Sequence, residues 1–218
     1  MYSNIHELRV RHIIQRRSTE SHEVHIEEYA PPYPDDHPHH NPLPNIDFSN
    51  IRTIEFHAEF SEPLTSLARN NDGVVHWPPT LQSIIFGKRF NDSIGGVNWP
   101  QRLESITFGE SFNRSIVGVN WPQRLKSITF GTSFNQPIVA VNNWPQSLQS
   151  ITFGEHFSQP IVGVTWPQNL RSITFGYRFS QPIVGVTWPQ SLRSITFGEL
   201  FNQPIVGVNW QRLESITF

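Results

Sequence analysis

Cysteine is absent from the 218 residues of this sequence. Its absence excludes disulfide bonds, metal sites built from thiolates and a thiol nucleophile. An excess of one charge is also lacking, because 16 Lys and Arg face 18 Asp and Glu, which gives a formal net charge of -2. A chain without a basic field lacks the electrostatic signature of nucleic-acid binding, so we expect no nucleic-acid partner.

Long apolar runs are missing as well. Arg9, Arg11 and Arg16 interrupt the apolar residues near the start of the chain, and no run of 18 apolar residues occurs anywhere. A secretory signal needs a continuous apolar segment, and a membrane-spanning helix needs a longer one. We therefore expect a soluble, cytoplasmic protein without a membrane partner.

A short segment recurs through most of the chain. Leu103 begins the sequence Leu-Glu-Ser-Ile-Thr-Phe-Gly, and close copies begin about every 22 residues, at Leu125, Leu148, Leu170, Leu192 and Leu213. A unit of this length cannot bury its own apolar side chains, so consecutive units must stack and share one core. The repeat therefore predicts a solenoid.

Each repeat contains one strand signal and no helix signal. Residues 105–108 alternate polar and apolar side chains, so Ile106 and Phe108 are predicted to face inward. Stacked at the usual strand separation of about 4.8 Å, such segments form one parallel sheet along the solenoid. Gly118 and Pro122 disfavour a helix on the return side of the same unit, which should be extended.

The repeat divides the chain into two regions. Residues 1–47 are polar and rich in histidine and proline, and we predict a leader that is largely disordered or forms a short hairpin capping the first coil. Residues 48–218 are predicted to form the solenoid, which stops within a repeat at Phe218. An unpaired strand edge pairs readily with another chain, so self-assembly end to end through residues 216–218 is one alternative function.

The region after the strand carries a distinctive motif. The run Phe-Asn-Gln-Pro-Ile at residues 134–138 recurs at 201–205, and each copy follows Leu-x-x-Ile-x-Phe-Gly. Between about residues 51 and 218 the sequence resembles the FNIP repeat family, a relative of leucine-rich repeats. The resemblance implies a right-handed, curved, leucine-rich-repeat-like solenoid used for protein interaction. We therefore expect a mainly β protein, a parallel β-solenoid of about eight coils with one strand in each coil and an extended, non-helical return side.

Aromatic and amide side chains recur at fixed repeat positions. We interpret the tryptophans and the strand-end phenylalanines as columns stacked inside the core, in preference to a ligand-binding cage. The asparagines that follow a second phenylalanine are predicted to satisfy backbone groups in the turn, with Ser158 and Ser180 interrupting their ladder. The tryptophan column consists of Trp77, Trp99, Trp121, Trp144, Trp166, Trp188 and Trp210.

Outward-facing threonines form a second regular feature. Rows of this kind resemble the flat arrays of ice-binding solenoids, so an ice-binding or surface-binding solenoid is another alternative function. Ser and Thr also suit any exposed strand, and a curved sheet does not match a flat lattice. The row consists of Thr107, Thr129, Thr152, Thr174 and Thr196.

The outward positions that vary between repeats are the candidate partner-binding site. Arginine and tyrosine beside exposed apolar groups are typical of interaction hot spots, although drift on a solvated face explains the same residues. Neighbouring arginines at strand spacing also repel each other, a cost that an acidic partner relieves. The candidates are His156, Arg171, Tyr177, Arg178, Arg193 and Leu200.

No residue pattern points to an enzyme. Glu110, Glu155 and Glu199 share a repeat position, but no two of them occupy adjacent coils. Residues 35–40 (Asp-Asp-His-Pro-His-His) have metal-ligand residue types, but they lack the rigid frame that a defined site needs. We expect a non-enzymatic protein-interaction module without a cofactor or metal, whose partner is a protein that the sequence does not identify.

Overall fold

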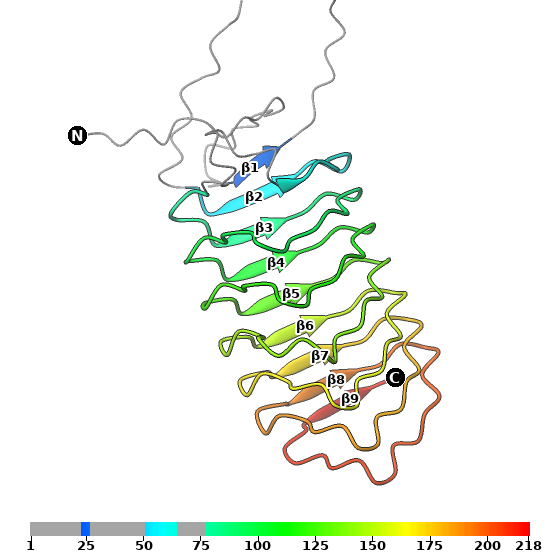
Figure 1. Cartoon of the computed structure of the whole chain (residues 1–218). Helices are drawn as coiled ribbons and strands as arrows, with labels where there is room; N and C mark the ends of the chain where they lie inside the picture. The colour runs from blue at the N-terminus through cyan, green and yellow to red at the C-terminus, as the bar shows by residue number, and fades with distance from the viewer. Residues whose placement is uncertain (1–22, 27–50, 65–76) are drawn as a thin grey trace, which may run out of the picture.

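A computed structural model describes the strand Glu23–Ile26, residues 51–64 and residues 77–218. The described residues form one sheet of nine parallel strands in chain order, as Figure 1 shows. The strands are β1 (Glu23–Ile26), β2 (Thr53–Phe56), β3 (Ser83–Ile85), β4 (Ser105–Thr107), β5 (Ser127–Thr129), β6 (Ser150–Thr152), β7 (Ser172–Thr174), β8 (Ser194–Thr196) and β9 (Ser215–Thr217). The prediction of a parallel β-solenoid with one strand per coil is confirmed.

The strand register places identical repeat positions side by side. Ile106 of β4 pairs with Ile84 of β3 and with Ile128 of β5, and the flanking serines and threonines pair in the same way from β4 onward. Ile106 is buried, whereas Ser105 and Thr107 are half-buried. A slip of one residue would turn the isoleucines out of the core, so burial of this one position fixes the register.

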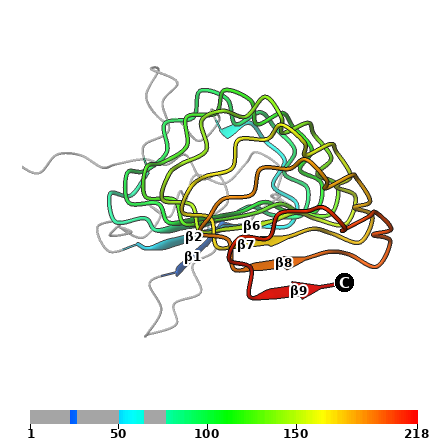
Figure 2. The ribbon, with the colours of Figure 1, turned by 90° about the horizontal axis from the view of Figure 1, so that it is seen from below.

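The return side of each coil is extended and turns without an α-helix in the part of the chain that the structure describes. Seen along the stack, the strands lie on a flat side and the connecting segments arch over the opposite side (Figure 2). Gly118, at one return-side turn, has φ 75°, a backbone conformation that glycine adopts most easily. The predicted non-helical return side is confirmed.

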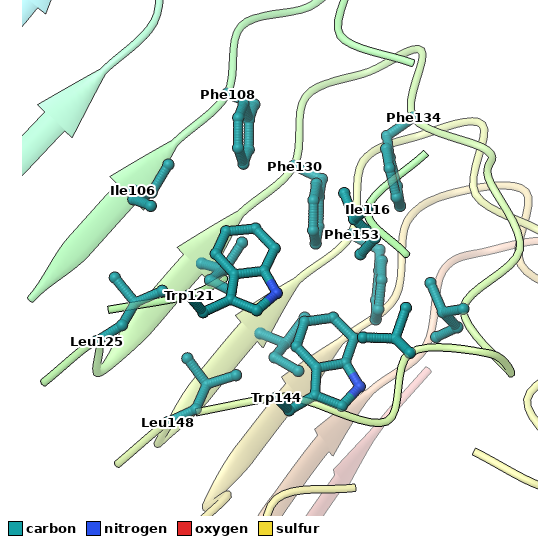
Figure 3. Close-up of a cluster of buried hydrophobic side chains, with 14 of the residues drawn as sticks. Ile106, Phe108, Ile116, Trp121, Leu125, Phe130, Phe134, Trp144, Leu148 and Phe153 are labelled. Carbon is teal, nitrogen blue, oxygen red and sulfur yellow. The ribbon is translucent and has the colours of Figure 1, made fainter. Parts of the chain in front are cut away.

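Two columns of phenylalanine and one of tryptophan fill the coil interior. Phe130 stacks on Phe108 of the preceding coil at a ring-centroid distance of 5.5 Å, and on Phe134 of its own coil at 4.0 Å. Trp144 stacks on Trp121 at 6.3 Å (Figure 3). These rings are buried, which confirms the interpretation of the tryptophan column and the strand-end phenylalanine column as core.

The columns are more closely spaced near the strands than on the return side. Ring-centroid distances between coils are 5.3 Å for Phe86–Phe108 and 6.0 Å for Phe90–Phe112. The Trp77–Trp99 distance on the return side is 6.2 Å. The rings of neighbouring coils therefore stack more closely beside the sheet than on the return side.

The glycine that follows each strand from β3 to β8 allows close contact between coils. A Cβ atom added to Gly131 would lie 2.0 Å from the carbonyl oxygen of Gly109 in the preceding coil. The same approach recurs from Gly87 to Gly198. Any larger residue at this position would force the backbones of neighbouring coils apart.

The sheet begins earlier than the predicted boundary at residue 48. β1 lies in the predicted leader and pairs in parallel register with β2, from Glu23 with Thr53 to Ile26 with Phe56. These four residues are therefore an edge strand of the solenoid sheet. The rest of the leader, including residues 35–40, lies outside the described residues.

Candidate functional site

The strand face offers two outward positions per coil, because each strand from β3 to β9 is only three residues long. The hydroxyl rows predicted for this face lie in register along the sheet. Their side chains are half-buried, and Oγ of Ser105 donates a hydrogen bond to Oγ of Ser83 at 2.8 Å. The threonine row contains Thr107, Thr129, Thr152, Thr174 and Thr196, the last residue of each strand from β4 to β8.

Four of the six candidate partner-binding residues lie together in the turns that follow the strands. Tyr177 and Arg178 follow β7, His156 follows β6 and Leu200 follows β8. The backbone N–H of Leu200 donates to the carbonyl oxygen of Tyr177 at 3.1 Å, which holds these two residues in adjacent coils. Their side chains are 43% and 49% exposed, respectively, so they form an exposed apolar pair.

Beside this pair, Glu155 lies close to both His156 and Arg178. Oε1 of Glu155 lies 3.6 Å from Nε2 of His156 and 3.9 Å from Nε of Arg178. All three side chains are well exposed, and ion pairs in such surroundings contribute about 1 kcal/mol or less. Burial of Tyr177 and Leu200 against a partner would therefore contribute more binding free energy than the charged groups of this cluster.

The other two candidates, Arg171 and Arg193, lie at the opposite ends of the strands. Each arginine immediately precedes its strand, and the N–H of Arg193 donates to the carbonyl oxygen of Arg171 at 2.8 Å. Tyr177 lies six positions after Arg171 along extended chain, a span of roughly 20 Å. The structure thus divides the predicted site into two groups, one at each end of β7 and β8.

The two arginines differ in what they contact. Nε of Arg193 lies 3.1 Å from Glu214, and its Nη1 donates to the carbonyl oxygen of Gln190 at 3.3 Å. Arg171 is exposed and has neither an ion pair nor a side-chain hydrogen bond within the described ranges. Of these two arginines, Arg171 is therefore the one whose charge is available to an acidic partner.

The structure adds a hollow that the sequence analysis did not single out. It measures about 680 Å³ and lies where the return side of two neighbouring coils leads back to β4 and β5. The signal in the sequence is the exact repetition of Asn-Trp-Pro-Gln-Arg-Leu at 98–103 and 120–125, which later coils alter. The hollow is lined by matched pairs from these two copies, among them Asn98 and Asn120, Gln101 and Gln123, and Arg102 and Arg124.

Metal-ligand residues do not gather in the part of the chain that the structure describes. No three His, Cys, Asp or Glu side chains among those residues lie close enough to share a metal ion. The same described residues contain no helix that is long and apolar enough to span a membrane.

One parallel strand per repeat, and a return side that has no α-helix where the structure describes it, define a leucine-rich-repeat-like solenoid. The FNIP repeat family matches residues 112–156 and 157–200, so these coils are FNIP repeats, as the sequence motifs predicted. A similar solved structure is that of CroV588, described as a novel circular leucine-rich-repeat protein, with 33% sequence identity and a TM-score of 0.66. The similarity covers 78% of this chain and 24% of that protein, so the chain spans about a quarter of its length. No curated protein matches the chain.

Proposed function

We propose that this solenoid is a non-enzymatic protein-interaction module that binds its partner along the strand side. The single observation that carries the proposal is the exposed pair Tyr177 and Leu200 in adjacent turns. A leucine-rich-repeat-like fold supports it, since such repeats create extended binding surfaces from stacked units.

The turns that present this pair are held in place by the backbone. The N–H of Arg178 donates to the carbonyl oxygen of Glu155 in the preceding coil at 2.9 Å. The N–H of Phe179 donates to the carbonyl oxygen of Gly176 at 3.1 Å, which closes the turn itself. A partner would therefore bind a preorganised surface and lose little entropy in ordering it.

Arg171 supplies a second contact at the other end of the strands. A standard interface buries about 800 Å² on each partner, which is wide enough to cover both ends of a three-residue strand. In this arrangement Tyr177 and Leu200 supply apolar contact, and Arg171 selects a partner that carries an acidic group opposite it.

Site-directed photo-crosslinking tests the proposal. A photoreactive phenylalanine analogue is placed at position 177 or 200, and at position 184 as the control, because Val184 is similarly exposed (46%) but lies on the return side. The three proteins are irradiated in lysate of the source organism. We expect the same crosslinked protein from positions 177 and 200, absent at position 184 and reduced by Arg171→Glu. Crosslinks that are equal at all three positions would overturn the strand-side proposal.

The two alternative functions stay predictions. Ice binding requires the threonine row, so Thr152→Tyr should abolish thermal hysteresis if that activity exists. Self-association through β9 would be seen as a rise in mass with concentration in sedimentation, which Ile216→Lys should prevent. Phe218 beside this strand is 59% exposed.

A further inference from the structure

The hollow beside β4 and β5 combines positive charge with hydrogen-bonding amides. Arg102 and Arg124 are exposed and line it together, with two asparagine and two glutamine side chains. Trp99 and Trp121 form its apolar wall and are themselves almost fully buried in the core. A volume of about 680 Å³ exceeds what a single ion needs and falls within the range of sites that hold organic ligands.

The repeat position of the two arginines has a structural role in other coils. Oγ of Ser147 donates to the carbonyl oxygen of Leu125 in the preceding coil at 2.7 Å, and Oγ of Ser191 donates to Leu170 at 2.6 Å. Thr80 makes the corresponding bond to the carbonyl oxygen of Ile51 at 2.7 Å. In these three coils a small hydroxyl residue therefore ties neighbouring coils together, and arginine at the same position gives up that bond.

No contact within the described part of the protein replaces this lost hydrogen bond for Arg102 and Arg124. Neither has an ion pair or a side-chain hydrogen bond there. The two acidic residues of the coil between them are engaged elsewhere, since Glu104 pairs with Lys126 at 2.7 Å and Glu110 with Lys88 at 3.0 Å. Two like charges at one position of adjacent coils also repel. Neither arginine therefore makes a side-chain contact that stabilises the described part of the fold.

We propose that Arg102 and Arg124 bind an acidic peptide segment that lies in the hollow and runs along the solenoid axis. Guanidinium groups pair with carboxylates through two parallel hydrogen bonds, and the amides beside them match the N–H and C=O groups of a peptide backbone. In an extended peptide, alternate side chains lie about 6.8 Å apart on one face. In the two coils that follow Arg102 and Arg124, the rings of Phe112 and Phe134 stack at a centroid distance of 6.0 Å. This spacing is close to that of carboxylates on alternate residues of an extended peptide.

The test uses a fluorescent peptide with glutamate at every second position and serine between. Its anisotropy is measured with the full chain, at low salt and again at higher salt. The Arg102→Ser/Arg124→Ser variant removes both charges, and it installs the residue that Ser147 and Ser191 show to be compatible with the coil. The matched control is Arg52→Ser/Arg114→Ser, which makes the same charge change outside the hollow.

We expect salt-dependent binding by the native chain, weaker by roughly tenfold for each arginine removed, because each loses charged hydrogen bonds. The control should bind as the native chain does, and Ser147→Arg should strengthen binding by adding a third arginine to the row. The serine variant should melt at the same temperature as the native chain or above it, which separates loss of binding from loss of folding.

Four results would overturn the proposal. The first is equal binding by the native chain and the serine variant. The second is equal binding of a peptide with glutamine in place of glutamate. The third is no binding of the acidic peptide at millimolar concentration. The fourth is displacement of the peptide by inorganic phosphate, which would identify a small-anion site. None of these results bears on the strand-side surface at Tyr177, so this site fails or stands independently of it.

Discussion

Oδ1 of Asn113 accepts a hydrogen bond from the backbone N–H of Asn135, the corresponding residue of the next coil, at 3.0 Å. The side-chain amide of Gln136 donates to the same oxygen at 3.0 Å. Each coil thus satisfies a backbone donor of the coil that follows it, as the amide ladder predicted from the sequence should. The ladder continues where serine replaces asparagine, because Oγ of Ser180 accepts from the N–H of Asn202 at 3.2 Å.

Removing one member of this ladder should destabilise the solenoid. Asn113→Ala leaves two partly buried donors without their acceptor, and we expect a loss of about 1–2 kcal/mol in the free energy of unfolding. Asn113→Ser should lose less, because serine continues the ladder with longer bonds. Urea unfolding of both variants measures the difference. Asn120→Ala, at an exposed position, should be neutral, and an equal loss there would refute the role of the ladder.

The glycine after each strand should tolerate no side chain. Gly131→Ala places a Cβ atom against the carbonyl oxygen of Gly109, and overpacking of this kind costs about 1–3 kcal/mol or more. The control is Gly118→Asn, since Gly118 has open space around it and asparagine accepts a positive φ more readily than most residues. Thermal unfolding should show a far larger loss for Gly131→Ala, and the reverse order would contradict the close approach of the coils.

Aromatic stacking should contribute most in the middle of the solenoid. Phe130 contacts Phe108, Phe134 and Phe153, with centroid distances from 4.0 to 5.6 Å, and it is buried. Phe130→Ala should therefore cost about 3–5 kcal/mol. Phe201→Ala, in the last coil where the ring is half-exposed, should cost clearly less in the same denaturation experiment. Similar losses at both positions would contradict the dependence of the cost on the burial of the ring.

Repetition made the fold predictable, and the same repetition hid part of the candidate site. The Ser-Ile-Thr segment determines strand, face and register together, because only its isoleucine can enter the core. Arg171 and Tyr177 were both predicted to face outward, yet sequence alternation does not show that a three-residue strand ends between them. The distance between them depends on the geometry of the turn after the strand, and the sequence of residues 171–177 does not determine that geometry.

The hollow was missed for a related reason. Within one repeat, an arginine just before the leucine that precedes the strand looks like an ordinary exposed charge. Only comparison with the other coils shows which hydrogen bond it replaces. That bond exists only between coils, as between Ser147 and Leu125, so no single repeat contains the information. The parallel pairing of β1 was missed in the same way, since the sequence analysis allowed for a capping hairpin and this pairing depends on a strand about thirty residues further along the chain.

The tryptophan column makes a prediction about the cost of a buried donor. Nε1 of Trp144 is buried and has no hydrogen-bond partner in the part of the chain that the structure describes, and Nε1 of Trp121 is in the same situation. An unsatisfied buried donor costs about 1–3 kcal/mol, which offsets part of what the indole ring contributes by packing.

Trp144→Phe removes the donor and keeps a ring in the column, so we expect it to lower the free energy of unfolding by less than about 1.5 kcal/mol. Trp144→Ala should cost about 3–5 kcal/mol. Phe157→Leu, which removes a buried ring without removing a donor, is the size control, and urea unfolding compares the three. If Trp144→Phe is as destabilising as Trp144→Ala, the indole N–H makes a hydrogen bond in solution, and the column is held by polar contacts as well as by stacking.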